Sequence, residues 1–160
     1  MTKIIIMTPS LKPWDAIGND VIKQRSLLLA KGVDCLVYAE FFDDTELDFK
    51  VTSEDELAYI ASTEPTLLFY HHALYWEKGE KLLTKLHKPT ILKYHNITPP
   101  EFYEKYDETS FHGTNAGRAQ TTRLVTCDFI KAFVGASEYN GEELKKIGAD
   151  PKLVSSIAPF

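Results

Sequence analysis

Hydrophobic residues along the chain fall into short runs that alternate with amphipathic stretches. Five runs are rich in β-branched or aromatic residues and predict strands at residues 3–8, 33–39, 66–71, 89–95 and 131–136, and a sixth strand is expected within 153–158. Between these runs, the spacing of apolar residues predicts helices at residues 19–31, 53–62, 77–87, 115–126 and 137–148. Residues 41–51 are acidic and aromatic and follow neither pattern, so we expect an irregular connection there.

Local signals mark the ends of several predicted helices. Ser53 and Glu56 have the spacing of a capping box, in which the serine accepts from the glutamate N–H and the carboxylate reaches back. Ser137 can cap the last helix, and Gly32 and Gly148 can close the first and the last. The buried face of the first helix is expected to contain its apolar residues Val21, Ile22, Leu28 and Leu29.

The order of these elements predicts the fold class. Strands that alternate with helices indicate a parallel sheet joined by right-handed crossovers. We therefore expect a Rossmann-like α/β domain, a doubly wound parallel sheet with helices on both faces. The 160 residues suit one domain with one core. In such folds ligands bind outside the carboxyl ends of the strands, so the segments that follow the strands are the places to search for a site.

Composition narrows the class of protein and of partner. Hydrophobic residues make up 44% of the chain and charged residues 26%, as in a folded soluble protein. The net charge of −5 offers no basic footprint, so we expect no nucleic-acid partner. The amino-terminal apolar run is too short for a signal peptide, and no segment has the roughly 20 apolar residues that cross a membrane. Because Cys35 and Cys127 also lack a pairing motif, we predict a cytoplasmic protein with free thiols.

Two segments after strands carry candidate chemistry. In ILKYHNITPP, a strand delivers His95 and Asn96, and the two prolines that follow hold the chain extended, which fixes where both side chains emerge. A structural histidine bonded to a neighbouring carbonyl is the alternative. In PWDAIGND, Gly18 stands before the predicted first helix, where free N–H groups and the helix dipole can approach a phosphate. The dinucleotide fingerprint is absent, so Gly18 can also be a tight entrance to the helix.

Histidines and arginines elsewhere supply further candidates. His71 and His72 are adjacent on a predicted strand and point to opposite faces, so one is expected to be packed and the other to face a cleft. They cannot easily share a metal ion, and no cysteine or carboxylate stands at ligand spacing, so we expect no metal site. Arg118 and Arg123 are five residues apart on a predicted helix, so one can face the cleft while the other lies in solvent.

Taken in order, four segments resemble the amino-terminal domain of the group 1 (family 4-like) retaining glycosyltransferases with the GT-B architecture. The resemblance covers nearly the whole chain and is carried by DAIGNDV, YHH, YHNITPPEFY and ASEYNGEELKKIG. It implies an enzyme of two Rossmann-like domains that transfers a sugar from a nucleotide-sugar donor to an acceptor with retention of configuration. This domain would lie on the acceptor side of the cleft.

The resemblance also implies roles for individual residues. Gly18 and Asn19 map onto the loop that approaches the donor diphosphate, and His95 maps onto the catalytic-site histidine that contacts the donor sugar. Arg118 is the candidate for recognising an anionic acceptor, and the remaining cleft candidates are Asn96 and His72. The chain departs from the family pattern because Ile17 precedes Gly18 where many members have a second glycine.

The second domain of the family, with its pair of donor-binding glutamates, has no counterpart in these residues. We therefore expect residues 1–160 to be an amino-terminal half whose donor-binding domain is absent from this chain. The implied co-substrate is a nucleotide-sugar, with no separate cofactor. The implied acceptor is a glycan, a lipid-linked sugar or a small molecule, and the full-length protein could contact a membrane peripherally. The alternatives are a non-catalytic sugar- or protein-binding domain of this fold and an unrelated nucleotide-dependent α/β enzyme, which the missing fingerprint disfavours.

Overall fold

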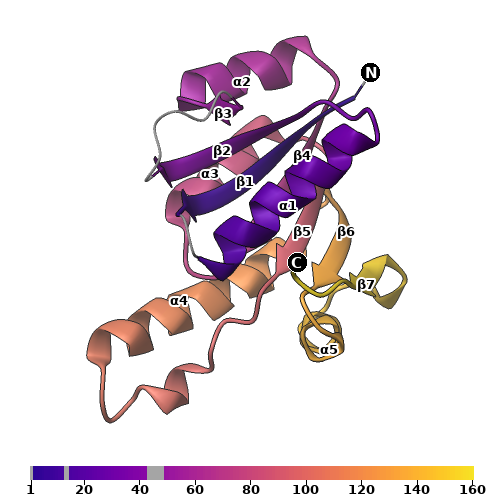
Figure 1. Cartoon of the computed structure of the whole chain (residues 1–160). Coiled ribbons are helices and arrows are strands. Elements are labelled where there is room, and N and C mark those ends of the chain that lie inside the picture. Colours follow the sequence, from indigo (N-terminus) through magenta and orange to yellow (C-terminus); the bar gives the residue numbers. More distant parts are fainter. Residues whose placement is uncertain (1, 13–14, 43–48) are drawn as a thin grey trace.

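A computed structural model of the chain describes residues 2–12, 15–42 and 49–160 (Figure 1). The strands are β1 (Lys3–Leu11), β2 (Cys35–Phe42), β3 (Lys50–Val51), β4 (Thr66–His72), β5 (Thr90–Tyr94), β6 (Ile130–Gly135) and β7 (Val154–Ser156). The helices are α1 (Ala16–Ala30), α2 (Glu54–Thr63), α3 (Glu77–Leu86), α4 (Glu108–Leu124) and α5 (Glu138–Lys146), with short 3-10 turns η1 (Pro100–Phe102) and η2 (Pro151–Leu153).

All strands run parallel, in the order β3-β2-β1-β4-β5-β6-β7. This is the doubly wound arrangement that the alternation of strands and helices predicts. The direction of winding reverses between β1 and β4, so the segments that leave these two strands diverge at the carboxyl edge. Such a switch point is where open α/β sheets place their ligands.

The two faces of the sheet are covered unequally. Among the described residues, α1 is the helix on one face, where Val21 packs with Ile6 and Val37. The other four helices contribute to a second, larger cluster on the opposite face, through Leu57, Leu83, Leu124 and Leu144. Figure 1 shows α1 on the near side of the strands and α3 behind them.

Most of the expected helix ends are confirmed. Ser53 Oγ accepts from the Glu56 N–H, and the Glu56 carboxylate reaches back to the N–H and hydroxyl of Thr52. Ser137 caps α5, and Gly32 and Gly148 adopt positive φ after α1 and α5, as expected of closing glycines. The cysteines Cys35 and Cys127 are free thiols. No helix that the structure describes is long and apolar enough to cross a membrane.

Two predicted helix starts were wrong. The first helix begins at Ala16 rather than at residue 19, because Asp15 caps it by accepting from the Gly18 N–H. The fourth begins at Glu108 rather than at residue 115, because Asp107 caps it, and its first turns are largely exposed and offer no apolar pattern.

Several other boundaries also differ from the prediction. Strand β1 continues past residue 8 to Leu11, and Pro9 is accommodated because β1 pairs there with β2 alone. The predicted irregular connection contains the end of β2 and the two-residue strand β3, and residues 43–48 within it lie outside the described residues.

The predicted buried face of α1 was also partly wrong. Val21 is buried, but the side chains of Ile22 and Leu29 are exposed, at 39% and 42%. The face that α1 turns toward the sheet contains Asp20 and Gln24 instead. Apolar periodicity cannot reveal a buried helix face that is polar. Asp20 and Gln24 on this face belong to the candidate site.

Candidate functional site

The carboxyl ends of β4 and β5 bring three polar side chains onto one face of the sheet. The two strands pair in parallel register, with His71 opposite Lys93. Because side chains alternate along a strand, Lys93 and His95 point to the same face as His71. Helix α1 covers this face and presents Asp20 and Gln24, one turn apart.

Asp20 and Lys93 form a buried ion pair at the centre of this group. The Lys93 Nζ lies 2.6 Å from Asp20 Oδ2, and the two side chains are 2% and 0% exposed. The other carboxylate oxygen, Oδ1, accepts from the backbone N–H of Phe160 at 3.3 Å. Both oxygens of the carboxylate therefore have a partner, as a buried charge requires.

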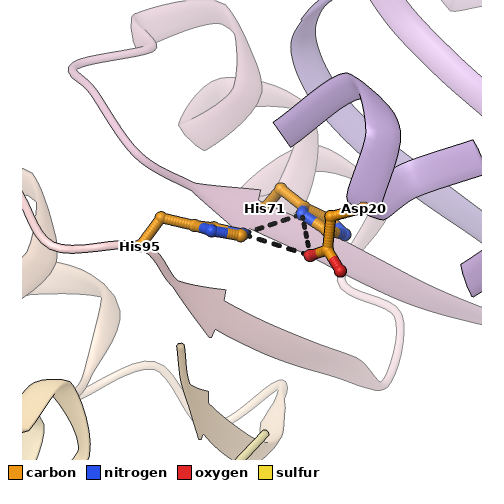
Figure 2. A group of neighbouring side chains, drawn as sticks. All are labelled: Asp20, His71 and His95. Atoms are coloured by element: carbon orange, nitrogen blue, oxygen red, sulfur yellow. Dashed lines mark hydrogen bonds and ion pairs between the residues drawn. The ribbon is translucent and has the colours of Figure 1, made fainter. Parts of the chain in front are cut away.

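Two histidine rings complete the network (Figure 2). His71 Nδ1 lies 2.9 Å from His95 Nε2, and His71 Nε2 lies 2.9 Å from Gln24 Oε1. The two rings stack with their centroids 5.0 Å apart. The His95 side chain is 7% exposed and that of His71 is fully buried.

Burial keeps both imidazoles neutral. It lowers the pKa of His95 to about 4, helped by the nearby Lys93 ammonium and opposed by Asp20 and Asp15. Burial, and then the neighbouring His95 and Lys93, hold the pKa of His71 well below its usual range. The network thus contains one compensated charge pair and two neutral rings at neutral pH.

The same residues have the separations of a possible metal site. Asp20 Oδ2, His71 Nδ1 and His95 Nε2 all lie within 4.8 Å of one another, and the carboxylate oxygen is 3.8 Å and 3.9 Å from the two nitrogens. However, the Lys93 ammonium already compensates this carboxylate, and a 2.9 Å contact joins the two nitrogens directly. The arrangement is that of a hydrogen-bonded network, in which a cation would have to displace a buried lysine.

Gly18 and Asn19 lie in the first turn and a half of α1, immediately before Asp20. The Gly18 N–H donates to Asp15 Oδ2 at 3.1 Å, and the Asn19 N–H donates to the Asp15 carbonyl at 2.8 Å. A Cβ atom on Gly18 would lie 2.5 Å from the Lys12 carbonyl oxygen. Gly18 is therefore a point of close backbone approach, and its N–H is capped by a side chain of the same chain. Pro13 and Trp14 of the segment PWDAIGND lie outside the described residues.

Asn96 directs the chain away from the sheet at the same edge. It is exposed and has φ of 67°, a left-handed conformation that asparagine tolerates better than most side chains. Ile97 then returns to the core, and its N–H donates to the Tyr94 hydroxyl at 3.1 Å. Pro99 is extended, as expected, and the turn η1 follows.

His72 is the packed member of the histidine pair, which corrects the expectation that it faces a cleft. Its side chain is 0% exposed, and Nε2 lies 2.8 Å from the Thr121 hydroxyl. That hydroxyl donates to the Gly117 carbonyl, so it accepts from His72. Burial lowers the pKa of His72 to about 4. The strand alternation was predicted correctly, but His71, the other member, is buried as well.

Arg118 links three elements. It donates to the Ile97 carbonyl at 2.7 Å and to Glu143 Oε1 at 3.0 Å, which ties α4 to the segment after β5 and to α5. It lines a pocket of about 120 Å³ between α4 and α5. Arg123 instead makes two hydrogen bonds to Glu80 on the outer surface. An anionic ligand at Arg118 would have to share the guanidinium with Glu143.

The sequence reasoning missed Asp20, Gln24 and Lys93. The signal for Lys93 was present, since a lysine in the middle of an apolar strand needs a buried partner of opposite charge. Nothing in the pattern of one strand shows which of the 23 acidic residues that partner is.

Comparison with known proteins identifies the fold. No protein-family model matches the sequence, and no curated protein matches it significantly. Among solved structures, Anabaena HepE in complex with UDP-glucose shares 14% identity and a TM-score of 0.56, over 98% of this chain and 43% of HepE. An alpha-glucosyltransferase in complex with UDP-glucose and DNA containing an abasic site shares 15% identity and a TM-score of 0.59, over 99% of this chain and 42% of its own.

The chain thus spans about two fifths of the length of these neighbours. At this identity the likeness concerns the fold. It confirms the predicted Rossmann-like α/β class, and it confirms the expected resemblance to a glycosyltransferase domain at the level of architecture.

Proposed function

We propose that this chain is the amino-terminal, acceptor-side domain of a two-domain GT-B glycosyltransferase, which transfers a sugar from a nucleotide-sugar to an acceptor with retention of configuration. One observation carries the proposal. His95, which follows β5, and the amino-terminal turns of α1 meet at the carboxyl edge of the sheet, next to the switch point between β1 and β4. His95 Nε2 lies 3.9 Å from Asp20 Oδ2, and the fold is shared with proteins solved with UDP-glucose. The donor-binding domain would belong to a longer protein.

In this proposal His95 holds the donor sugar as a neutral hydrogen-bonding group. Its lowered pKa keeps a second charge away from the reaction centre, and the network fixes the ring before substrate arrives. Such preorganisation makes a polar group effective as charge develops in the transition state. The amino-terminal end of α1, with Gly18 and Asn19, would turn its positive dipole toward the diphosphate.

The acceptor would be a glycan, a lipid-linked sugar or a small molecule, and Asn96 and Arg118 remain the candidates to contact it. The net charge of −5 argues against nucleic acid as the acceptor, although one structural neighbour was solved with DNA. We propose no metal ion or cofactor, because the nucleotide-sugar serves as co-substrate. Contact with a membrane surface would be peripheral and would belong to the longer protein.

A second candidate function is a non-catalytic sugar- or protein-binding domain of the same fold. The capping of α1 favours it, because the Asp15 carboxylate already accepts from the Gly18 N–H. A diphosphate would have to displace that carboxylate or bind beyond it. This candidate predicts a ligand at the same edge without any transfer reaction in the longer protein.

Titration of the ¹⁵N-labelled chain with UDP-glucose and GDP-mannose separates these functions. As half of a two-sided cleft, residues 1–160 should bind weakly, with amide shifts confined to residues 15–20 and 95–97, and should transfer no sugar alone. Glucose without the nucleotide is the control ligand. Tight binding or turnover by the isolated chain would contradict the half-enzyme proposal.

The longer protein supplies the catalytic test. His95→Ala there should lower turnover strongly while leaving the domain folded, which a thermal melt checks, whereas Arg123→Ala on the outer surface should leave turnover unchanged. An unchanged rate for His95→Ala would remove His95 from the site, and absence of transfer by the parent protein would favour the binding module.

A further inference from the structure

We propose that Gln24 and His71 are positioning residues that hold His95 in one tautomer, protonated at Nε2 and bare at Nδ1. The proposal rests on the function above only for what His95 contacts. The tautomer itself follows from the described residues.

The proton order starts at Gln24. Its Oε1 can only accept, and it lies 2.9 Å from His71 Nε2, so this nitrogen of His71 bears the hydrogen. A neutral imidazole has one N–H, which leaves His71 Nδ1 as an acceptor. The 2.9 Å contact between His71 Nδ1 and His95 Nε2 then requires His95 to donate. The position of the hydrogen on each ring is thereby fixed, at Nε2 of His71 and at Nε2 of His95.

The neighbouring charges do not offer these protons another acceptor. Asp20 Oδ2 is 3.8 Å from His71 Nδ1 and 3.9 Å from His95 Nε2, beyond hydrogen-bond distance, and it accepts from Lys93 at 2.6 Å. The charges of Asp20 and Lys93 balance each other, and the two histidine rings hydrogen-bond to each other. Gln24 therefore determines the direction of both hydrogen bonds: His71 Nε2 donates to Gln24, and His95 Nε2 donates to His71 Nδ1.

The consequence for His95 is a lone pair on Nδ1. This nitrogen has no hydrogen-bond partner among the described residues, and the His95 side chain is 7% exposed. A bare ring nitrogen accepts from a hydroxyl or an N–H and repels the lone pairs of a phosphate oxygen. His95 is thus set to receive a ligand hydroxyl.

Nitrogen NMR of the histidine rings in residues 1–160 tests the tautomer without any ligand. In the parent chain His95 should show a protonated Nε2 and a bare Nδ1. Gln24→Met removes the acceptor while keeping the length of the side chain, and His95 should then populate both tautomers. Gln24→Glu keeps an acceptor at the same position and should retain the parent spectrum at pH values where His71 stays neutral, since an imidazolium donates from both ring nitrogens. A protonated Nδ1 in the parent, or an unchanged His95 spectrum in Gln24→Met, overturns the proposal.

Kinetics in the longer protein test the positioning role separately. With melting temperature as the check on folding, Gln24→Met should raise the donor KM or lower kcat several-fold, less than His95→Ala does, and Gln24→Glu should restore the parent values. Full activity in Gln24→Met after loss of the tautomer overturns the positioning role. Failure of the parent protein to transfer sugar would overturn the proposed function and leave the tautomer assignment standing.

Discussion

At the residue scale, the fold contains a buried ion pair between Lys93 and Asp20, whose side chains are 2% and 0% exposed. Lys93 and Asp20 lie on a central strand and on the only described helix of that sheet face, so their pairing fixes α1 against β5. Removing one partner leaves the other charge buried and uncompensated, which is far more costly than removing both.

Lys93→Met should therefore destabilise the chain by about 3–5 kcal/mol, whereas the double variant with Asp20→Asn should recover much of that loss. Urea unfolding of the two single variants and the double variant provides the measurement. Lys145→Met, which breaks the surface pair with Glu142, is the control and should change stability little. Additive losses in the double variant would show that the two charges do not depend on each other.

A second residue-scale prediction concerns pH. The pKa of His72 is lowered to about 4 in the fold, against an ordinary value near 6.5, so the unfolded chain binds this proton first as the pH falls. Its contribution to stability is complete above pH 6.5 and is lost toward pH 4, by on the order of 3 kcal/mol. His72→Gln, which can still donate to Thr121, should flatten the fall in melting temperature over this window. Parallel curves below pH 6.5 would contradict the assignment.

At the scale of elements, apolar periodicity and capping residues predicted most strands and helices. The prediction failed for α1, whose buried face contains polar side chains. The strands and the ends of α2 and α5 follow from runs and capping residues that are visible in one segment. Helix α1 was misplaced because its start depends on Asp15, and its buried face was misread because Asp20 and Gln24 serve a network built from two distant strands.

Gly18 and Gly113 both lie inside helices, so alanine substitutions at the two positions can be compared directly. A Cβ on Gly18 would lie 2.5 Å from the Lys12 carbonyl, whereas a Cβ on Gly113 would meet nothing within 4 Å. Gly18→Ala should cost roughly 2 kcal/mol or more through displaced backbone, and Gly113→Ala should stabilise α4 by about 0.5–1 kcal/mol. The denaturant midpoints of both variants provide the measurement. If Gly18→Ala does not lower the midpoint, close backbone approach is not the reason for glycine at this position.

At the scale of the whole molecule, the fold class could be predicted, and so could the edge of the sheet where the candidate residues gather. Parallel strands place every strand-end segment at one edge, which is why His95, Asn96 and the start of α1 were expected together. The depth of each side chain below that edge could not be predicted, and it decides the roles of His71 and His72. Burial depends on which helix covers each face, and this is a property of the assembled sheet.

The unequal cover of the two faces predicts unequal stability across the molecule. The amino-terminal half of α1 is anchored by Asp20 and Gln24, but Leu27 and Leu29 in its second half are 43% and 42% exposed. Native-state hydrogen exchange should therefore find amides after Gln24 opening at lower free energy than those of β1 and β4.

Amides just before Gln24 should exchange between these limits, because the ion pair and the histidine network hold that half of α1 to β4 and β5. Lys93→Met should lower their protection to the level of the second half of α1, while the helices α3 and α5 on the opposite face should lose protection only in proportion to the global loss of stability. Protection that falls equally on both faces would show that α1 opens only with the whole domain, and that the buried network contributes to global stability without anchoring one end of the helix.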